Sequence, residues 1–357
     1  DGTMVQSASI AMNPKTGGVT AVVGGRGKHV FRGFNRATQM RRQPGSTIKP
    51  IVVYAPALEH GYFYDSELQD KKQSYGTNNY TPKNYDDTYS GKVPMYKALY
   101  ESLNAPAVWL LNKIGVNQGY KMAEKFGLPV EKGDKNLALA LGGMTKGVSP
   151  QQIARAYATF DNDGQMPTPY YITKIEDASG KVVAQNKGSK VKHVISSKTA
   201  REMTSMLIGV YEHGTGETAK PAGDTLAGKT GTTNSGVKGD ESNDRDKWIV
   251  GYTPDVVVAT WEGYDDTNSS HVLNDISERN INGLFKNEMS GILANTPGTK
   301  FTVQDAQTRA NKRVKNTSGW KSFFNGGDND LMNRFNQSVN NIGDKASQFW
   351  NNVKSLF

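Results

Sequence analysis

The chain has 357 residues, of which 36% are hydrophobic, so it is long enough to bury a full core. It has no cysteine, which excludes thiol nucleophiles, disulfides and thiolate metal sites. Its net charge of +9 indicates a mildly basic surface, and because no dense Lys/Arg block with interleaved aromatic residues occurs, we expect no nucleic-acid partner.

The chain begins with a strand pattern that changes to a helical one. Residues 5–12 and 19–24 are short alternating or apolar runs, and the Asn, Pro and Gly of 13–18 between them predict a hairpin turn. From 48 to 58 apolar residues recur at helical spacing. Pro56 predicts a kink or an early end in that helix, because proline lacks the N–H group that an inner helical position needs.

The middle of the chain is mainly helical in pattern, and strands return after a polar stretch and several helices. We expect a loop over 67–92 and helices over 95–100, 106–114, 117–126 and, after a capping box at Ser149, 150–163. A second hairpin is predicted over 170–184. The later elements are a helix over 199–211, strands over 226–233, 248–252 and 256–264, and a helix over 281–293.

This order predicts an α+β fold, in which both ends of the domain form one mainly antiparallel sheet that is flanked by helices. An all-helical lobe is inserted between the two ends. We expect the domain to cover 1–300, with the sheet lobe at about 1–45 and 165–300 and the helical lobe at about 46–164.

The remaining residues, 301–357, form a polar tail rich in Asn, Gly and Lys. Apolar residues at steps of three or four predict an amphipathic helix over about 329–356. Such a helix either packs back on the domain or binds a partner or a membrane surface.

Three short boxes carry the chemistry, and only one combination gives them in sequence: Ser46-Thr-Ile-Lys49, Ser102-Leu-Asn104 and Lys229-Thr-Gly231. Ser46 would attack a carbonyl, with Lys49 as the base that takes its proton. A lysine can do this only when neutral, and burial or a second cation such as Lys229 lowers its pKa. Ser102 would relay a proton to a leaving amine, and the amide of Asn104 would hold the backbone of a peptide substrate.

The third box also offers groups for binding a substrate. Lys229 supplies a positive charge for a carboxylate, and Thr230 and Thr232 supply hydroxyl groups. Gly231 leaves room for a ligand backbone to come close. Strict strand alternation would place Lys229 and Thr230 on opposite faces, so we expect the site to lie along a twisted strand edge.

Each box also occurs elsewhere as an isolated match. Lys15-Thr-Gly17 lies in the predicted first turn and precedes every candidate serine, and Ser338-Val-Asn340 is followed by no Lys-Thr-Gly. Taken singly, each box is typical of an ordinary turn or helix start. The ordered set is therefore the signal.

The set resembles the triple motif of the acyl-serine penicillin-recognising enzymes, which are an established example of it. In that family the identity of the base that assists acylation is disputed. The resemblance is closest to the transpeptidase domain of class A penicillin-binding proteins and covers about 5–295. It extends to four stretches around the boxes: Arg42-Gln-Pro-Gly-Ser-Thr-Ile-Lys-Pro50, Pro82-Lys-Asn-Tyr-Asp86, Leu139-Ala-Leu-Gly-Gly143 and Trp248-Ile-Val-Gly-Tyr-Thr-Pro-Asp255.

The resemblance implies a D,D-transpeptidase that cross-links peptidoglycan through an acyl-enzyme on Ser46. Its oxyanion hole would use the backbone N–H groups of Ser46 and Thr232. The implied partners are stem peptides ending in D-Ala-D-Ala, β-lactam antibiotics and other cell-wall synthesis proteins, and no cofactor or metal is implied.

The resemblance also implies a location at the outer face of the bacterial cytoplasmic membrane. No run of about 18 apolar residues occurs, so we expect no spanning helix in this sequence. The anchor and the glycosyltransferase domain that the class carries would precede residue 1.

Four alternatives are weighed at this point. A D,D-carboxypeptidase would use water as the acceptor, and a β-lactamase would need a deacylating glutamate, for which Glu124 and Glu131 lack a surrounding signature. Gly223-Asp-Thr-Leu-Ala-Gly-Lys-Thr230 also matches a P-loop, but the Gly-rich residues after it cannot begin a helix well. A binding module that keeps the fold without catalysis is the fourth.

Overall fold

The computed structural model describes residues 2–314 except 29, 187, 189, 239 and 241, and in α8 it describes the backbone but not the side chains of 275–280. Residues 1–307 form one compact unit, and a second unit begins at Thr308. The predicted helix at 329–356 and the box at Ser338 lie outside the described residues. The predicted domain and lobe boundaries therefore stay predictions.

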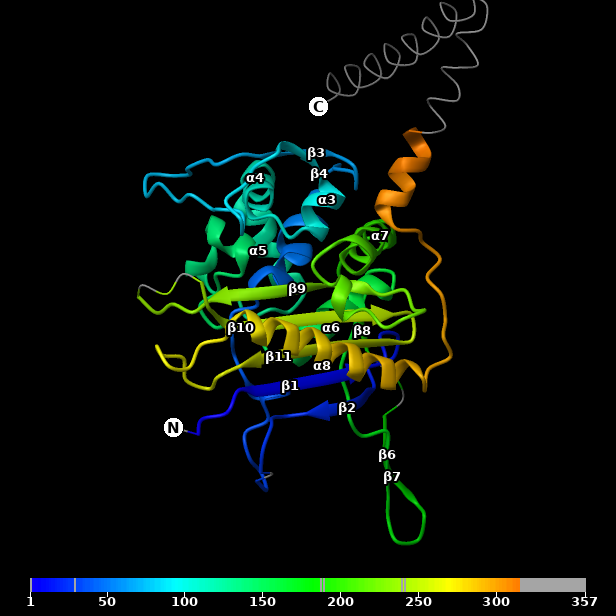
Figure 1. The fold of residues 1–357 in the computed structure, drawn as a ribbon. Helices are drawn as coiled ribbons and strands as arrows, with labels where there is room; N and C mark the ends of the chain where they lie inside the picture. The colour runs from blue at the N-terminus through cyan, green and yellow to red at the C-terminus, as the bar shows by residue number, and fades with distance from the viewer. Residues whose placement is uncertain are drawn as a thin grey trace, which may run out of the picture. The chain divides into compact units, whose positions relative to one another are not determined.

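A five-stranded antiparallel sheet with the order β2-β1-β11-β10-β9 forms the centre of the first unit (Figure 1). Its strands are β1 Gln6–Met12, β2 Val19–Val23, β9 Ala227–Asn234, β10 Asp244–Thr253 and β11 Val256–Gly263. Both ends of the domain thus contribute strands, which confirms the predicted α+β fold and its first hairpin. The third box lies on β9, at one edge of the sheet.

Helices cover the two faces of the sheet (Figure 1). On one face lies α8 (Asp275–Leu293), and on the other lies α6 (Pro150–Asp161), which begins with the capping box predicted at Ser149. A further helix, α7 (Ser197–His213), packs along β9. The edge strand that carries the third box is therefore held in place by helices as well as by β10.

Most of the smaller elements agree with the sequence pattern. The predicted helices are α3 Met95–Tyr100, α4 Asn104–Ile114 and α5 Val116–Lys125, and the second hairpin is β6 Lys174–Glu176 with β7 Val182–Gln185. The pattern did not predict α1 Arg36–Gln39 or the short pairs of β3 Glu67–Asp70 with β4 Gly91–Pro94 and β5 Gln165–Pro167 with β8 Val191–His193. Elements of three or four residues are too short to show a period.

The helix predicted over 48–58 is divided into three pieces: the 3₁₀ turn η1 Gly45–Ile48, the π turn η2 Pro50–Tyr54 and α2 Ala55–Glu59. Pro56 has no N–H group, so the carbonyl of Val52 cannot receive the usual helical bond. The chain forms a π turn just before this proline, in which the N–H of Ala55 donates to the carbonyl of Pro50, five residues back. The helix is thus irregular just before Pro56 and ends at Glu59, three residues after it.

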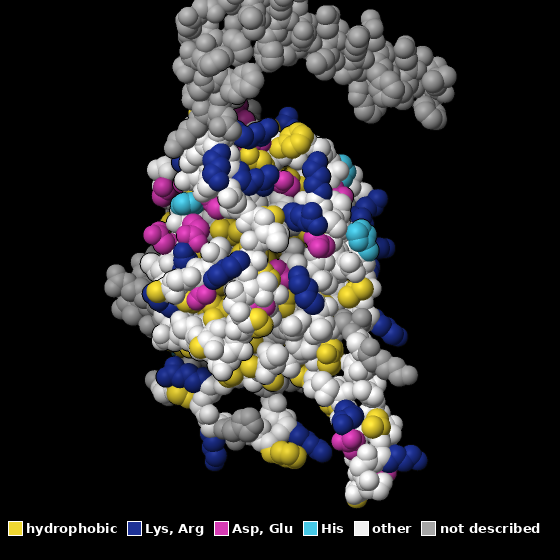
Figure 2. Space-filling model, turned by 90° about the vertical axis from the view of Figure 1, so that its right-hand side faces the viewer, with side chains coloured by type: hydrophobic (Ala, Val, Ile, Leu, Met, Phe, Trp, Pro, Cys, Tyr) yellow, Lys and Arg dark blue, Asp and Glu magenta, His cyan; other side chains and the backbone are white. Residues whose placement is uncertain are grey.

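Surface charge is mixed rather than gathered. On the face drawn in Figure 2, Lys and Arg side chains are interspersed with Asp and Glu. Within the described residues, no helix combines the length and the apolar composition needed to cross a membrane. The same part of the chain contains no group of three or more His, Asp or Glu side chains that could hold a metal ion.

Candidate active site

Ser46 lies on η1, which is pressed against the edge strand β9. Gly45 has a φ of 53°, and a Cβ added to it would lie 2.2 Å from the carbonyl oxygen and 3.0 Å from the nitrogen of Thr232. A Cβ added to Gly231 would lie 2.9 Å from the nitrogen of Thr47. Two glycines therefore allow the backbones at Ser46 and Thr232, which hold the predicted oxyanion donors, to approach each other.

Two lysines from different boxes are buried beside the serine of the second box. The Nζ atom of Lys49 donates to the carbonyl of Ser102 at 2.6 Å and lies 3.5 Å from its hydroxyl. The Nζ atom of Lys229 donates to the same hydroxyl at 2.8 Å and to the carbonyl of Thr230 at 2.9 Å. Both lysines have 0% relative exposure. The structure thus brings the three boxes together at the Ser102 hydroxyl.

This burial changes the proton affinity of both amines. Burial lowers the pKa of Lys49 well below its ordinary value, and the positive charge of Lys229 lowers it further. Burial lowers the pKa of Lys229 to about 7. Burial and a neighbouring positive charge both favour the neutral form of Lys49, whereas burial is the main effect on Lys229.

Ser102 occupies a sharp turn between α3 and α4. Its φ of 59° is left-handed, a conformation that costs a residue with a side chain about 1–2 kcal/mol. In this conformation its carbonyl accepts from Lys49 while its hydroxyl accepts from Lys229. Strain at a residue that contacts both lysines is a feature typical of functional sites.

The amide of Asn104 has protein partners at both ends. Its Oδ1 atom accepts from Lys49 at 2.6 Å, and its Nδ2 atom donates to the carbonyl of Lys83 at 2.8 Å. One N–H of the amide is left for a substrate. The contact with Lys49 adds a positioning role, and the predicted contact with a substrate backbone stays a prediction.

Asn84 is a buried residue of the site to which sequence reasoning gave no role. Its Oδ1 atom accepts from the backbone nitrogens of Asn104 at 2.9 Å and Ala105 at 3.0 Å, and its Nδ2 atom donates to Asp70 at 2.7 Å. It thereby caps the start of α4 from a distant loop. Only the segment 82–86, quoted for the resemblance, pointed to this residue, because no local spacing indicates a cap from outside the helix.

A cleft of about 810 Å³ opens in front of Ser46. Its walls include Asn104, the loop at 80–87, residues 138–143 and the end of β9 from Thr232 to Asn234. Of the three residues predicted to bind substrate, Thr232 lines the cleft. The hydroxyl of Thr230 instead lies 2.5 Å from that of Thr215, and Gly231 packs against η1. Contacts of the last two with a substrate stay predictions.

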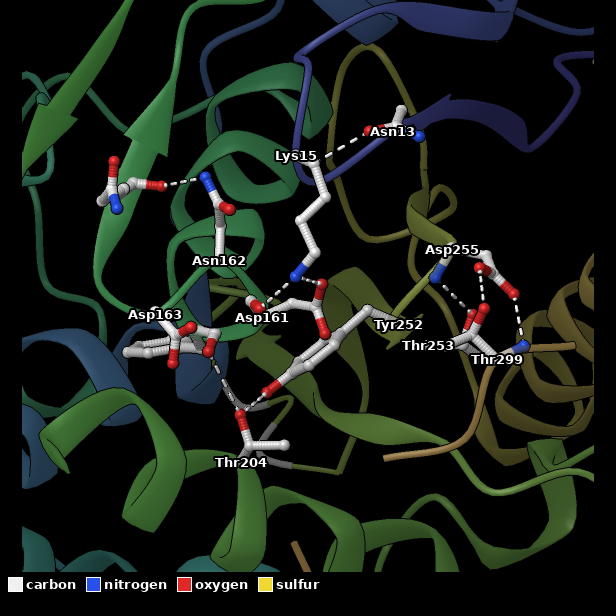
Figure 3. Close-up of polar contacts among 12 residues, drawn as sticks. Asn13, Lys15, Asp161, Asn162, Asp163, Thr204, Tyr252, Thr253, Asp255 and Thr299 are labelled. Carbon is white, nitrogen blue, oxygen red and sulfur yellow. Dashed lines mark hydrogen bonds and ion pairs between the residues drawn. The ribbon is translucent and has the colours of Figure 1, made fainter. Parts of the chain in front are cut away.

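The other Lys-Thr-Gly triplet has a different environment. Figure 3 shows Lys15 reaching Asp161 at the end of α6, with Nζ and Oδ2 2.7 Å apart. The Asp161 side chain is only 4% exposed. Lys15 therefore ties the first hairpin turn to α6, and the structure keeps it apart from the cleft.

The residues behind two alternatives also lie apart from this chemistry. Among the described residues, the cleft lining includes neither Glu124 nor Glu131, and Glu131 pairs with Lys146 at 3.0 Å. The P-loop match at 223–230 continues into the strand β9 rather than opening a helix, which agrees with its rejection on sequence grounds.

Comparison with known proteins gives one family. The model of the penicillin binding protein transpeptidase domain matches residues 8–278. Penicillin-binding protein 2a of Streptococcus pneumoniae is 40% identical over the whole chain and 50% of its own length. Penicillin-binding protein 1F of Bacillus subtilis is 46% identical over 75% of the chain and 36% of its own length. The chain thus spans half or less of these curated relatives.

Solved structures of penicillin-binding proteins are similar to this chain as well. Penicillin-binding protein 1A from Haemophilus influenzae has a TM-score of 0.71 and 29% identity, over 84% of this chain and 49% of that one. The PonA1 protein from Mycobacterium tuberculosis, in complex with penicillin V, has a TM-score of 0.71 and 25% identity, over 84% of this chain and 82% of that one.

The left-handed turn at Ser102 leads to a stability prediction. A glycine adopts this φ without strain, whereas an alanine retains the strain, so we expect Ser102→Gly to be more stable than Ser102→Ala by about 1 kcal/mol. Both variants lose the hydroxyl, so the comparison isolates the backbone. Urea unfolding of both measures the difference. Ser290→Gly and Ser290→Ala are the control pair. Ser290 is exposed and lies within a helix, so there the glycine variant should be the less stable of the two. Equal stability of the two Ser102 variants would contradict the prediction.

Proposed function

The chain belongs to the family of penicillin-binding protein transpeptidase domains, and we propose that it is the D,D-transpeptidase part of a peptidoglycan cross-linking enzyme. The proposal rests on one observation, the convergence of two buried lysines on the Ser102 hydroxyl beside Ser46. In the proposed reaction, a stem peptide ending in D-Ala-D-Ala is the donor, and an amine on a neighbouring stem is the acceptor.

The first proposed step is attack by Ser46 on the penultimate carbonyl, with Lys49 as the base. A neutral amine has two N–H groups and one lone pair. The two acceptors at 2.6 Å, the carbonyl of Ser102 and the amide oxygen of Asn104, take the two N–H groups. The carbonyl of Leu103, at 3.1 Å from the same Nζ atom, receives a third N–H only while the amine is charged. In the neutral amine the lone pair would be available for the proton of Ser46, whose hydroxyl makes no hydrogen bond within the described residues.

The next proposed step expels the terminal D-Ala. The backbone N–H groups of Ser46 and Thr232 stabilise the oxyanion, each donor being worth about 3 kcal/mol in such sites. The proton on Lys49 passes through the Ser102 hydroxyl to the leaving amine, and Lys229 holds that hydroxyl in place. The acceptor amine then attacks the ester, its proton returns to Ser46, and the new peptide bond forms.

The partners and location follow from the same proposal. β-Lactams would acylate Ser46 as mimics of the donor, as the penicillin V complex of the Mycobacterium tuberculosis relative suggests. The whole protein would act at the outer face of the cytoplasmic membrane, held by an N-terminal anchor, with other cell-wall synthesis proteins as partners. A D,D-carboxypeptidase or a β-lactamase would share the acylation step and differ in what removes the acyl group.

The proposed function predicts a covalent penicillin adduct. We expect incubation with benzylpenicillin to add the mass of one intact penicillin, located on Ser46, because the strained lactam acylates the serine and no amine leaves. Intact-mass and peptide mass spectrometry measure it. Ser46→Ala should abolish the adduct, and Lys49→Ala should slow it about 10³-fold through loss of the base.

Two outcomes would contradict parts of the proposal. No adduct, or an adduct on another residue, would overturn the acyl-serine mechanism. An adduct on Ser46 that is released within seconds would favour a β-lactamase, whereas release over many minutes is expected of a transpeptidase.

The contact between η1 and β9 predicts a severe effect of Gly45→Ala. The added methyl group would meet the carbonyl of Thr232, and the φ of 53° disfavours alanine, so the two oxyanion donors must separate. We expect a loss of about 10²-fold or more in the rate of penicillin acylation, the effect of removing one such donor. Stopped-flow acylation measures it. Gly61→Ala, which also has a positive φ but open space around its Cβ, is the control and should acylate normally.

The two lysines predict a bell-shaped pH profile for the second-order rate of acylation by penicillin. Lys49 must be neutral, so the rate rises as the pH passes above its lowered pKa. Lys229 must be charged to bind the penicillin carboxylate, so the rate falls as the pH passes above about 7. Lys229→Arg should keep the acid limb and move the alkaline limb to higher pH, because arginine does not titrate there. An unchanged alkaline limb would contradict the role of Lys229.

A further inference from the structure

A second cavity of about 570 Å³ lies next to the catalytic cleft, and charged side chains dominate its wall. We call it the basic pocket and define it by six of its lining residues: Arg41, Arg42, Lys146, Arg245, Asp246 and Asp265. Four cations face two carboxylates. Lys146 pairs with Glu131, which does not line the pocket, at 3.0 Å, and Arg42 pairs with Asp246, so the positive excess rests on Arg41 and Arg245. The proposed mechanism has not yet used either charge.

The basic pocket adjoins the cleft. Gln43 lines both cavities, and its Nε2 atom donates to the carbonyl of Met144 at 3.3 Å. Successive residues also divide between the two cavities, since Gly143 lines the cleft and Met144 the basic pocket. The chain makes the same step from one cavity to the other after Asp244. A group held in the basic pocket would therefore lie next to a ligand in the cleft.

The two carboxylates of the pocket already have protein partners. Asp246 is buried, lies 3.5 Å from the Nε atom of Arg42 and accepts from the indole of Trp261 at 2.9 Å. Asp265 accepts from Arg36 at 2.7 and 2.5 Å. These contacts neutralise the acidic groups, so they do not offset the remaining cations.

Two arginines are left without such a partner. Arg41 donates to the backbone carbonyls of Thr38 and Met40, and Arg245 is exposed. Neither forms an ion pair with a carboxylate in the part of the chain that the structure describes. Guanidinium groups in this state are suited to a carboxylate ligand, which they bind through paired N–H groups.

Arg245 lies at an irregular position of strand β10. The register between β9 and β10 shifts between Asp244 and Asp246, which makes Arg245 the extra residue of a bulge. A bulge changes the direction in which a side chain leaves the strand and is common beside active sites. The bulge therefore links the edge strand of the catalytic cleft to the cation of the basic pocket.

We propose that the basic pocket is a carboxylate subsite for the acceptor strand, an inference that rests on the proposed transpeptidation. An acceptor peptide carries an amine and also its own terminal carboxylate, whereas water carries neither. With the carboxylate held by Arg41 and Arg245, the amine attacks the ester carbon at Ser46. The new C–N bond forms, the C–O bond to Ser46 breaks, and the proton from the amine returns to the serine oxygen.

The test compares two acceptors that differ only in charge. A small D-alanyl thioester acylates the intact chain, and Nα-acetyl-lysyl-glycyl-glycine or its C-terminal carboxamide serves as the acceptor. Mass spectrometry measures the ratio of transfer to hydrolysis for each. We expect the free acid to give about five-fold more transfer than the carboxamide, the effect of one well-placed exposed ion pair. Added salt should reduce this preference.

Variants test whether the two arginines cause the preference for the acceptor with a free carboxylate. Arg41→Gln with Arg245→Gln should bring the two acceptors to equal transfer, while Arg41→Lys with Arg245→Lys should restore part of the preference. Lys286→Gln, which removes an exposed charge on α8, is the control and should keep it. Penicillin labelling of Ser46 should be unchanged in all of these variants, because acylation does not involve the acceptor.

The outcomes separate the two proposals. Equal use of the acid and the carboxamide by the unchanged chain, with normal penicillin labelling, would overturn the subsite alone. An equal loss in Lys286→Gln would also overturn it, since the preference would then reflect overall charge. Absence of penicillin labelling in the unchanged chain would overturn the proposed function and the subsite with it.

Discussion

The burial of two lysines against one serine hydroxyl is the constraint on which the rest of the site depends. A buried amine is tolerated only when oxygen atoms surround it, because the loss of its water shell is otherwise too costly. Lys49 meets this need with acceptors from three consecutive residues, Ser102, Leu103 and Asn104. Since few carbonyls can point at one atom from a regular helix, the chain must turn sharply there. The left-handed conformation of Ser102 follows from this requirement.

The same constraint explains why the sheet edge and the 3₁₀ turn are so close. Lys229 must reach Ser102 from β9 while Ser46 remains next to Lys49, so β9 and η1 have to share one wall of the site. Glycine at 45 and 231 permits this approach, because a Cβ at either position would enter the opposite backbone. Both glycines thus set how closely the backbones of Ser46 and Thr232 approach, and these two residues carry the N–H groups that we propose as the oxyanion donors.

Much of this arrangement could be predicted from the sequence, although not all of it. The main strands and helices follow from hydrophobic period, and the ordered boxes point to Ser46, Ser102 and Lys229 as candidates. The period cannot show that Asn84 caps α4, because that contact joins a loop to a helix across the fold. Nor can it show the bulge at Arg245, which depends on how β9 and β10 pair. Local rules predict local structure, and these two features arise from contacts between distant segments.

Competition between water and an amine for the acyl-enzyme explains why a site that binds the acceptor would be needed. Water is present at very high concentration, so an amine captures the acyl group only if binding raises its effective concentration at the ester. In the proposed mechanism the buried lysines would activate any nucleophile that reaches the ester on Ser46, so they would not distinguish an amine from water. Discrimination has to come from a group that the acceptor has and water lacks. A terminal carboxylate is such a group, and Arg41 and Arg245, which form no ion pair of their own within the described residues, line the cavity on the far side of Gln43. Activation and acceptor choice would then reside in adjoining cavities, which lets the second vary while the lysine pair stays fixed.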